Sequence, residues 1–254
     1  EFVAPFPCLL ASHRWPSCST DCEVLVVDVP PALAASRWWY ARLRKHMRVV
    51  RVDAPDATPE TCDLLLAPGA HWSPDTVAAL QTAFGKRFLY GWDYVLLEQD
   101  VVEMPRVPSA DRGDRPVVFA AGGSDPRHLL PQMLAWAGPP PPAQPWVALV
   151  PQYSVTLPPL PSWVEPRVFS RDLLRHAALL VTTFGVTCYE ALYWGIPAFM
   201  VASSPSTAED AVRLMRASRG AVRAVGLPEP DFPDSLRTLI HSLMEQRAER
   251  QRMQ

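Results

Sequence analysis

The chain has 254 residues, and its 24 Lys and Arg residues nearly balance its 26 Asp and Glu residues, leaving a net charge of −2. This length suits one large or two medium α/β domains, and the balanced charge provides no field that would recruit nucleic acid or an anionic membrane. No apolar run approaches the roughly 20 residues that span a bilayer, and no signal-peptide pattern is visible, so we expect a cytoplasmic protein with no integral membrane segment.

The first half of the chain alternates buried strands with helical segments. Strands are predicted at residues 22–28, 49–53, 64–67 and 86–90, with helices around 38–43 and at 75–84. Strands separated in this way indicate β-α-β units and hence a parallel sheet. Asp28 ends the first strand, where it either contacts a substrate or caps the next helix. His71 follows the third strand, at the end where ligands usually bind, and is either catalytic or an exposed loop histidine.

The second half continues the same alternation after a break. Residues 105–115 contain prolines, a glycine and alternating charges, which predicts a linker between a domain at 1–104 and a domain at 116–254. Strands are predicted at 117–121, 146–150, 167–169, 179–182, 198–202 and 221–225, with helices after most of them and a terminal helix from 234.

Two strand–turn–helix units in this half have small turns that contain glycine. Their notable residues are Gly122, Gly123, Ser124 and Asp125 in the first, and Thr183, Gly185, Thr187 and Glu190 in the second. A small-residue turn that opens a helix directs backbone N–H groups and the positive end of the helix dipole at one point, where a phosphate binds well. Glu190 lies about one helical turn after Thr187, so both can face one ligand. The alternative is an ordinary β-α unit with a solvated glutamate.

Cysteine usage indicates a reducing compartment. The five cysteines, an odd number, fit free thiols better than a disulfide framework. Cys8, Cys18 and Cys22 lack a paired Cys-x-x-Cys and an evident fourth ligand, which argues against zinc. We therefore expect no metal and no other cofactor. The chain begins with Glu-Phe and not with Met, which indicates a fragment of a longer protein.

The two turn motifs resemble those of two-domain GT-B nucleotide-sugar enzymes. The nearest resemblance is to the UDP-sugar hydrolase of pseudaminic-acid biosynthesis and to the peptidoglycan N-acetylglucosaminyltransferase. Residues 122–125 match the family's Gly-Gly-Ser/Thr-Asp, residues 183–190 match its Ser-x-Gly-x-Thr-x-x-Glu, and Gly195 and Pro197 supply the Gly-x-Pro that follows. The resemblance implies an α/β fold with two Rossmann-like parallel-sheet domains, of which the N-terminal one is incomplete.

The resemblance also implies roles for individual residues. The Gly122–Asp125 loop would approach the ligand, the helix start at 183–187 would hold the diphosphate, Glu190 would take the ribose hydroxyls, and the backbone around Phe169 would contact the uracil. The ligand would be a UDP-sugar, with a possible sugar acceptor, in bacterial surface-glycan or nonulosonic-acid biosynthesis.

The sequence departs from the family pattern at three places. The hydrolase's catalytic histidine lies in a Gly-x-Gly-His turn that residues 1–21 lack, so we expect either that this turn lies upstream of Glu1 or that another residue, such as His71, replaces its histidine. Glu98 stands where the hydrolase has Arg, and Ser and Thr at 203–207 replace an Asn-Gln pair. Two interpretations follow. One is an enzyme that breaks the anomeric C–O bond by transfer to water or a sugar acceptor. The other is a catalytically degenerate protein that binds a nucleotide-sugar or acts as a scaffold.

Overall fold

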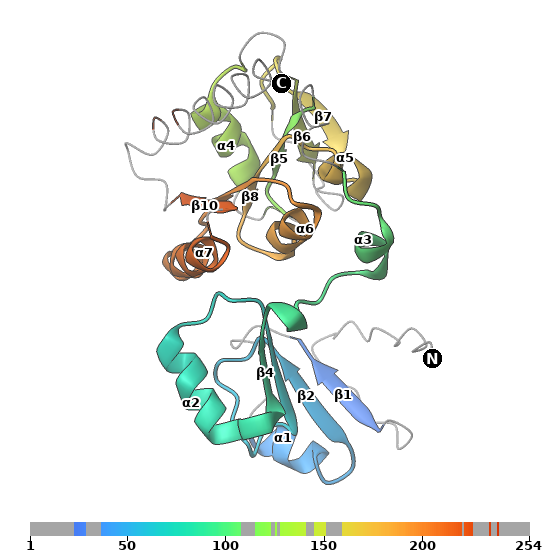
Figure 1. Cartoon of the computed structure of the whole chain (residues 1–254), viewed down its shortest axis with the longest axis vertical. Coiled ribbons are helices and arrows are strands. Elements are labelled where there is room, and N and C mark those ends of the chain that lie inside the picture. The colour runs from blue at the N-terminus through green and yellow to red at the C-terminus, as the bar shows by residue number, and fades with distance from the viewer. Residues whose placement is uncertain are drawn as a thin grey trace. The chain divides into compact units, whose positions relative to one another are not determined.

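The chain folds into two compact units (Figure 1). The computed structural model describes residues 23–28, 37–107, 115–122, 125, 128–140, 145–150, 159–219, 221–225, 234 and 238. The smaller unit comprises Glu1–Ala67 and Ala78–Leu89, and the larger comprises Pro68–Val77 and Tyr90–Gln254. Some predictions concern residues outside the described ranges. These residues are Cys8, Cys18, Cys22, Gly123, Ser124 and most of the predicted terminal helix.

The smaller unit contains a four-stranded sheet whose spatial order follows the chain. The strands of this sheet and the helices between them are β1 (Val24–Val27), α1 (Arg37–Leu43), β2 (Arg48–Val52), β3 (Leu64–Pro68), α2 (Pro74–Phe84), the short 3-10 helix η2 (Gly85–Arg87) and β4 (Phe88–Gly91). The last residue of β3, the first four residues of α2 and the last two of β4 belong to the larger unit. The β1–β2 and β2–β3 pairs are parallel. All four strands lie within two residues of their predicted bounds.

A buried arginine lies in the core of this smaller unit. Arg51 on β2 is 2% exposed, and its guanidinium donates to Asp56 at 2.9 Å. The same guanidinium lies 4.9 Å from the centre of the Tyr40 ring. A buried cation requires such a partner because its desolvation is otherwise uncompensated.

The larger unit is built on a six-stranded parallel sheet. Its elements are the 3-10 helix η3 (Trp92–Tyr94), α3 (Gln99–Glu103), β5 (Val117–Ala120), α4 (Leu129–Ala137), β6 (Trp146–Val150), β7 (Glu165–Val168), α5 (Arg171–Arg175), β8 (Leu179–Thr183), α6 (Val186–Trp194), β9 (Ala198–Val201), α7 (Pro205–Ala217) and β10 (Val222–Val225). The strand order is β10-β9-β8-β5-β6-β7, and every neighbouring pair is parallel. The parallel-sheet α/β architecture predicted from the sequence is confirmed.

Each face of this sheet has its own hydrophobic core because successive strand residues point to opposite faces. On one face, Phe119 and Val181 pack in a cluster with Met133 of α4. On the other, Leu180 and Met200 pack in a cluster that includes residues of α5, α6 and α7. All residues of β5 and β6 are buried, as the continuous apolar runs predicted, whereas the edge strand β7 is exposed along its length.

One short helix has no counterpart in the sequence prediction. The five-residue helix α3 has a single buried residue, Val101, which joins the second core cluster. The indole of Trp194 donates a hydrogen bond to the Val101 carbonyl at 3.2 Å. Five residues are too few to display a helical hydrophobic period, so tertiary contacts define this element. No helix in the described part of the chain combines the length and apolar character needed to cross a membrane.

The two-faced core predicts the effect of truncating a valine. Val181 is 0% exposed in the sheet centre, whereas Val168 on β7 is 68% exposed. Val181→Ala should lower the free energy of unfolding of the larger unit by about 1.5–3 kcal/mol, because it removes buried methyl groups and leaves a cavity. Val168→Ala, the same change at an exposed strand position, should shift it by less than about 0.5 kcal/mol. Urea unfolding followed by circular dichroism measures both, and equal effects would contradict the assigned core.

Candidate functional site

The strand order of the larger sheet reverses between β5 and β8. These neighbours pair in parallel register, with Ala120 opposite Thr182, so the turns that leave them start at the same edge of the sheet. A Cβ atom built on Gly122 would lie 3.9 Å from Oγ1 of Thr183, and Gly122 has φ +87°. Ligands of open α/β sheets bind outside the carboxyl ends of the strands at such a reversal. The two turns predicted from the sequence therefore meet at one edge.

The start of α6 differs from the starts of α4, α5 and α7. Side chains accept hydrogen bonds from the first turns of three helices: Asp125 for α4, Ser170 for α5 and Ser204 for α7. Helix α6 begins after Gly185 without a side-chain cap and without an acidic residue in its first turn. Its first N–H groups and its dipole are thus directed outward from the β8–α6 turn, and Thr187 lies half-buried beside them.

Asp125 acts on its own helix in this structure. Its carboxylate oxygens accept hydrogen bonds from the backbone N–H groups of Leu129, at 2.7 Å, and Leu130, at 3.0 Å. Asp125 is 7% exposed and has a positive φ of 39°. The carboxylate thereby fills the anion-binding position at the start of α4. A direct contact of Asp125 with a ligand stays a prediction.

Glu190 is a buried carboxylate one turn into α6. Only 3% of the residue is exposed, and its Oε1 accepts a hydrogen bond from Nε of Arg171 at 3.2 Å. Burial raises the pKa of Glu190 above its ordinary value, the contact with Arg171 opposes this shift, and the charges of Glu98 and Asp100 add to it. A solvated surface role for Glu190, the alternative reading of the sequence, is excluded by its burial.

The guanidinium of Arg171 binds three carboxylates at once. Besides Glu190, its Nη1 donates to Asp100 at 2.9 Å and its Nη2 donates to Glu98. Burial alone would lower the pKa of Arg171, but these three hydrogen bonds together raise it. Glu98, which reverses the charge expected from the family resemblance, is therefore paired with a cation from α5. Arg171 was not predicted from the sequence as a site residue. No pattern along the sequence connects it to partners that lie 19 to 73 residues away.

His71 lies against the β8–α6 turn in the larger unit. Its Nδ1 is 2.9 Å from the Tyr189 hydroxyl, and its ring centre is 5.2 Å from that of Phe184, between Thr183 and Gly185. The histidine is 6% exposed, so the prediction of an exposed loop histidine is wrong. Gly69 permits this approach, because a Cβ at Gly69 would lie only 2.3 Å from the Tyr189 hydroxyl.

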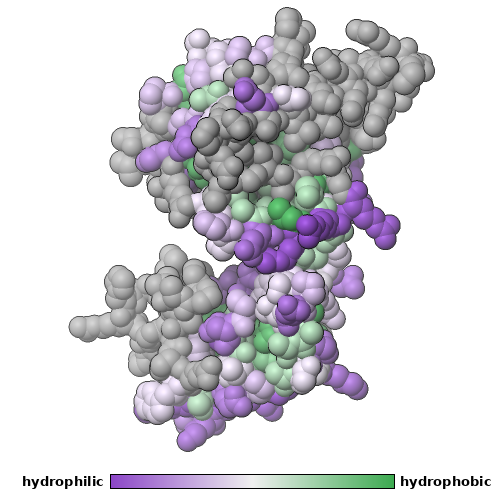
Figure 2. Space-filling view, turned by 90° about the vertical axis from the view of Figure 1, so that its left-hand side faces the viewer, coloured by the Kyte–Doolittle hydropathy of each residue, from purple (hydrophilic) through white to green (hydrophobic). Residues whose placement is uncertain are grey.

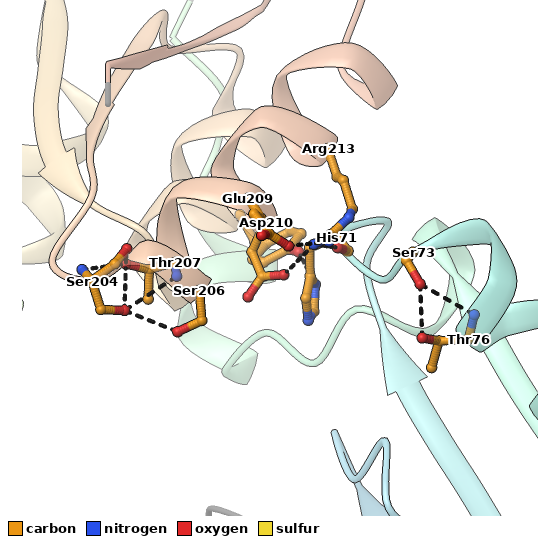
Figure 3. Close-up of polar contacts among 10 residues, drawn as sticks. His71, Ser73, Thr76, Ser204, Ser206, Thr207, Glu209, Asp210 and Arg213 are labelled. Carbon is orange, nitrogen blue, oxygen red and sulfur yellow. Dashed lines mark hydrogen bonds and ion pairs between the residues drawn. The ribbon is translucent and has the colours of Figure 1, made fainter. Parts of the chain in front are cut away.

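Helix α7 also contacts the loop that carries His71. The Arg213 side chain extends from α7 to the His71 carbonyl, with Nη1 at 3.4 Å, and binds Glu209 and Asp210 at 2.8 Å each (Figure 3). Strongly hydrophilic side chains gather on the surface of the larger unit where α7 lies (Figure 2). The position of His71 is thus set by contacts from both α6 and α7.

The hydroxyl residues at the start of α7 bind one another. Ser204 accepts a hydrogen bond from the backbone N–H of Thr207, Thr207 Oγ1 accepts from the N–H of Ser204, and Ser206 lies 3.0 Å from the Ser204 hydroxyl (Figure 3). This capping box satisfies the helix start. This structural role explains the hydroxyl residues at the start of α7 without a sugar ligand.

Phe169 and Asp28 lie apart from these contacts. Phe169, just before α5, is half-buried and packs on the core cluster that includes α6. Asp28 belongs to the smaller unit, where it follows β1 and is exposed. Partial burial and the charge of Asp53 raise the pKa of Asp28 above its ordinary value. Contacts of Phe169 with a base and of Asp28 with a substrate stay predictions.

The described cysteines are buried free thiols. Cys62 and Cys188 are both 0% exposed. Burial raises the pKa of Cys188 to about 12, and its Sγ contacts the Thr183 carbonyl at 3.3 Å. A thiol with such a pKa is not a nucleophile at neutral pH, so Cys188 serves to pack the base of α6.

Comparison with known proteins supports the fold. No family model matches the chain, and no curated protein matches it. Among solved structures, the spinosyn rhamnosyltransferase complexed with thymidine diphosphate matches with a TM-score of 0.56 and 17% identity over 88% of this chain and 65% of that one. The calicheamicin glycosyltransferase matches with a TM-score of 0.50 and 18% identity over 90% of this chain and 69% of that one.

A third match, the glycosyltransferase of kitacinnamycin, has a TM-score of 0.51 and 15% identity over 87% of this chain and 67% of that one. The chain therefore spans about two thirds of the length of these structures. At such low identity the similarity defines the architecture and leaves the chemistry open. Two parallel-sheet α/β domains of the GT-B glycosyltransferase fold are the architecture of this chain.

Proposed function

We propose that this chain binds a nucleoside diphosphate sugar at the edge of the larger sheet where β5 and β8 end. The observation that carries the proposal is the uncapped start of α6 beside Gly122, with a buried carboxylate one turn further on. The helix start would hold the diphosphate, and Glu190 would accept hydrogen bonds from the ribose. The Gly122 loop would approach the ligand, together with the adjoining Gly123 and Ser124.

The reaction that fits this arrangement is cleavage of the anomeric C–O bond, with transfer of the sugar to water or to an acceptor hydroxyl. The leaving group is a nucleoside diphosphate, and negative charge grows on its β-phosphate as the bond breaks. Backbone N–H groups and a helix start stabilise such charge without reorganisation. The family resemblance favours a UDP-sugar in the bacterial cytoplasm, for surface-glycan or nonulosonic-acid synthesis. The structural relative bound to thymidine diphosphate favours a pyrimidine nucleotide more generally.

The general base in this proposal is His71. Its ring contacts Phe184 within the β8–α6 turn, and its Nδ1 pairs with the Tyr189 hydroxyl. When Nδ1 carries the ring proton and donates a hydrogen bond to that hydroxyl, Nε2 is the basic nitrogen of the ring. It can then take a proton from water or from an acceptor hydroxyl. Asp28 stays a second candidate from the smaller unit.

The second candidate function is a protein that binds a nucleotide-sugar without turning it over, or that acts as a scaffold. The burial of His71, at 6% exposed, favours this reading, because a base must reach its substrate.

The role of the α6 start can be tested by capping it. Gly185 has extended backbone with φ 162°, and a Cβ there would meet nothing within 4 Å, so Gly185→Asp should fit and cap α6 as Asp125 caps α4. Unfolding free energy should change by only a few tenths of a kcal/mol. UDP affinity, measured by isothermal titration calorimetry, should fall about tenfold or more, because a carboxylate would occupy the diphosphate position.

Gly185→Ala is the matched control, since it adds the Cβ without the charge. It should keep UDP affinity within about threefold of the parent chain. In the parent chain, UDP at 100 times its dissociation constant should stabilise the fold by about 2.7 kcal/mol in a thermal melt. Equal affinity of the Gly185→Asp and Gly185→Ala variants for UDP would overturn the assignment of this helix start.

The role of His71 is tested by turnover. His71→Asn should lower the rate of UDP release from a panel of UDP-sugars about 100-fold while leaving UDP affinity unchanged, because it removes the base and not the diphosphate site. His176→Asn is the control, since the polar partner of His176, the residue that follows α5, is Asp172 among the described residues, through its carbonyl and its carboxylate. A parent chain that binds UDP but releases none from any UDP-sugar would favour the non-catalytic reading.

A further inference from the structure

We propose that Arg171 is a specificity-determining residue that makes this site prefer a ribonucleotide, by fixing the carboxylate of Glu190 as an acceptor for the ribose hydroxyls. The inference rests on the proposed nucleotide-binding function and adds a residue to it. Arg171 would act through Glu190 and would not touch the nucleotide itself, so it is a positioning residue.

The geometry of the pair leaves Glu190 able to accept more hydrogen bonds. Arg171 binds Oε1 of Glu190 through Nε, at 3.2 Å. Among the described residues, this is the one polar side-chain contact of Glu190, so Oε2 keeps its acceptor capacity. A buried carboxylate that a cation holds on one oxygen, with acceptor capacity left on the other, suits a pair of vicinal hydroxyls. A site built to hydrogen-bond a hydroxyl discriminates strongly against an analogue that lacks it.

The guanidinium is itself held in place by two further carboxylates. Asp100 at the start of α3 and Glu98 just before it bind Nη1 and Nη2, and both are more exposed than Glu190. All three nitrogens of Arg171 are therefore engaged by carboxylates. This explains why an arginine near a proposed diphosphate site would not bind the phosphate. It also fixes the orientation of Nε toward Glu190, because a planar guanidinium with two anchored nitrogens cannot turn the third away.

The charge balance makes the ionisation of Glu190 depend on Arg171. The charged groups around Glu190 in the described part of the chain are Arg171 on α5 and Glu98 and Asp100 before and in α3. Burial already raises the pKa of Glu190, and Arg171 is the group that opposes the shift. Ribose hydroxyls bind best to the ionised carboxylate, so UDP affinity should fall as pH drops through this raised pKa. Without Arg171 the pKa rises further, and the loss should begin at a higher pH.

The test compares UDP, 2′-deoxy-UDP and uridine by calorimetry between pH 5.5 and 8. The parent chain should prefer UDP to 2′-deoxy-UDP about tenfold. Arg171→Met should lower UDP affinity about tenfold, lower 2′-deoxy-UDP affinity much less, and move the acid loss of UDP binding to higher pH. Glu190→Gln should lower the UDP preference to the same extent and remove its pH dependence.

Arg175→Met is the matched control, because Arg175 lies on the same helix and pairs with Asp172 at 2.7 Å without reaching Glu190. It should keep the nucleotide preference of the parent chain. Arg171→Lys retains the positive charge but loses the forked donors of the guanidinium, and it should show an intermediate preference for UDP over 2′-deoxy-UDP. This variant replaces Arg171→Met in the test if a thermal melt shows that Arg171→Met is unfolded.

The outcomes separate the two proposals. A parent chain that binds neither UDP nor 2′-deoxy-UDP overturns the proposed function, and this inference with it. A parent chain that binds UDP, with an unchanged UDP preference in Arg171→Met, overturns the inference alone. An Arg171→Met variant that loses UDP and 2′-deoxy-UDP affinity equally while keeping uridine affinity also overturns it, because that pattern identifies a direct phosphate contact.

Discussion

The parallel pairing of β5 with β8 is the constraint on which the candidate site depends. The register sets Ala120 opposite Thr182, and the strand order reverses at this pair. The helices that follow cover opposite faces, since α4 packs on the cluster with Phe119 and α6 on the cluster with Leu180. The chain therefore leaves two neighbouring strands in diverging directions, and ligands of open α/β sheets usually bind at such an edge. Each other feature of the site is positioned relative to this edge.

The helix starts of the larger unit differ in whether a side chain caps them. The first N–H groups of a helix lack partners within it, and Asp125, Ser170 and Ser204 supply acceptors for α4, α5 and α7. Gly185 supplies none for α6. A side-chain cap contributes about 1 kcal/mol of stability, and α6 lacks one. In the function proposed above, the diphosphate takes the place of the missing cap at the start of α6.

Buried ionisable groups near that turn are held by residues from distant segments. Glu190 is paired with Arg171, which is anchored in turn by two exposed carboxylates. His71 is held by Tyr189 and by the contact of Arg213 with its carbonyl. In both cases a polar group that would be costly to bury alone has a partner, because an unpaired buried charge or hydrogen-bonding group destabilises the fold by several kcal/mol. The same contacts fix the direction of the group, as a binding or catalytic role requires.

The amino-acid sequence by itself determined the strands, the turns and the parallel architecture. Trp146–Val150 is a strand at its predicted bounds, because a run of five apolar residues suits a strand covered on both faces. The small residues of the two turns likewise predict a strand-to-helix transition, because they suit the local backbone conformation of such a turn.

Only the tertiary structure decided that Asp125 caps its own helix, that His71 is buried, and that Val101 anchors a five-residue helix. It also decided the Arg171–Glu190 and His71–Tyr189 pairs, whose members lie 19 and 118 residues apart. Periodicity and turn chemistry report on neighbours along the chain, whereas burial and charge pairing arise only when the sheet brings distant segments together.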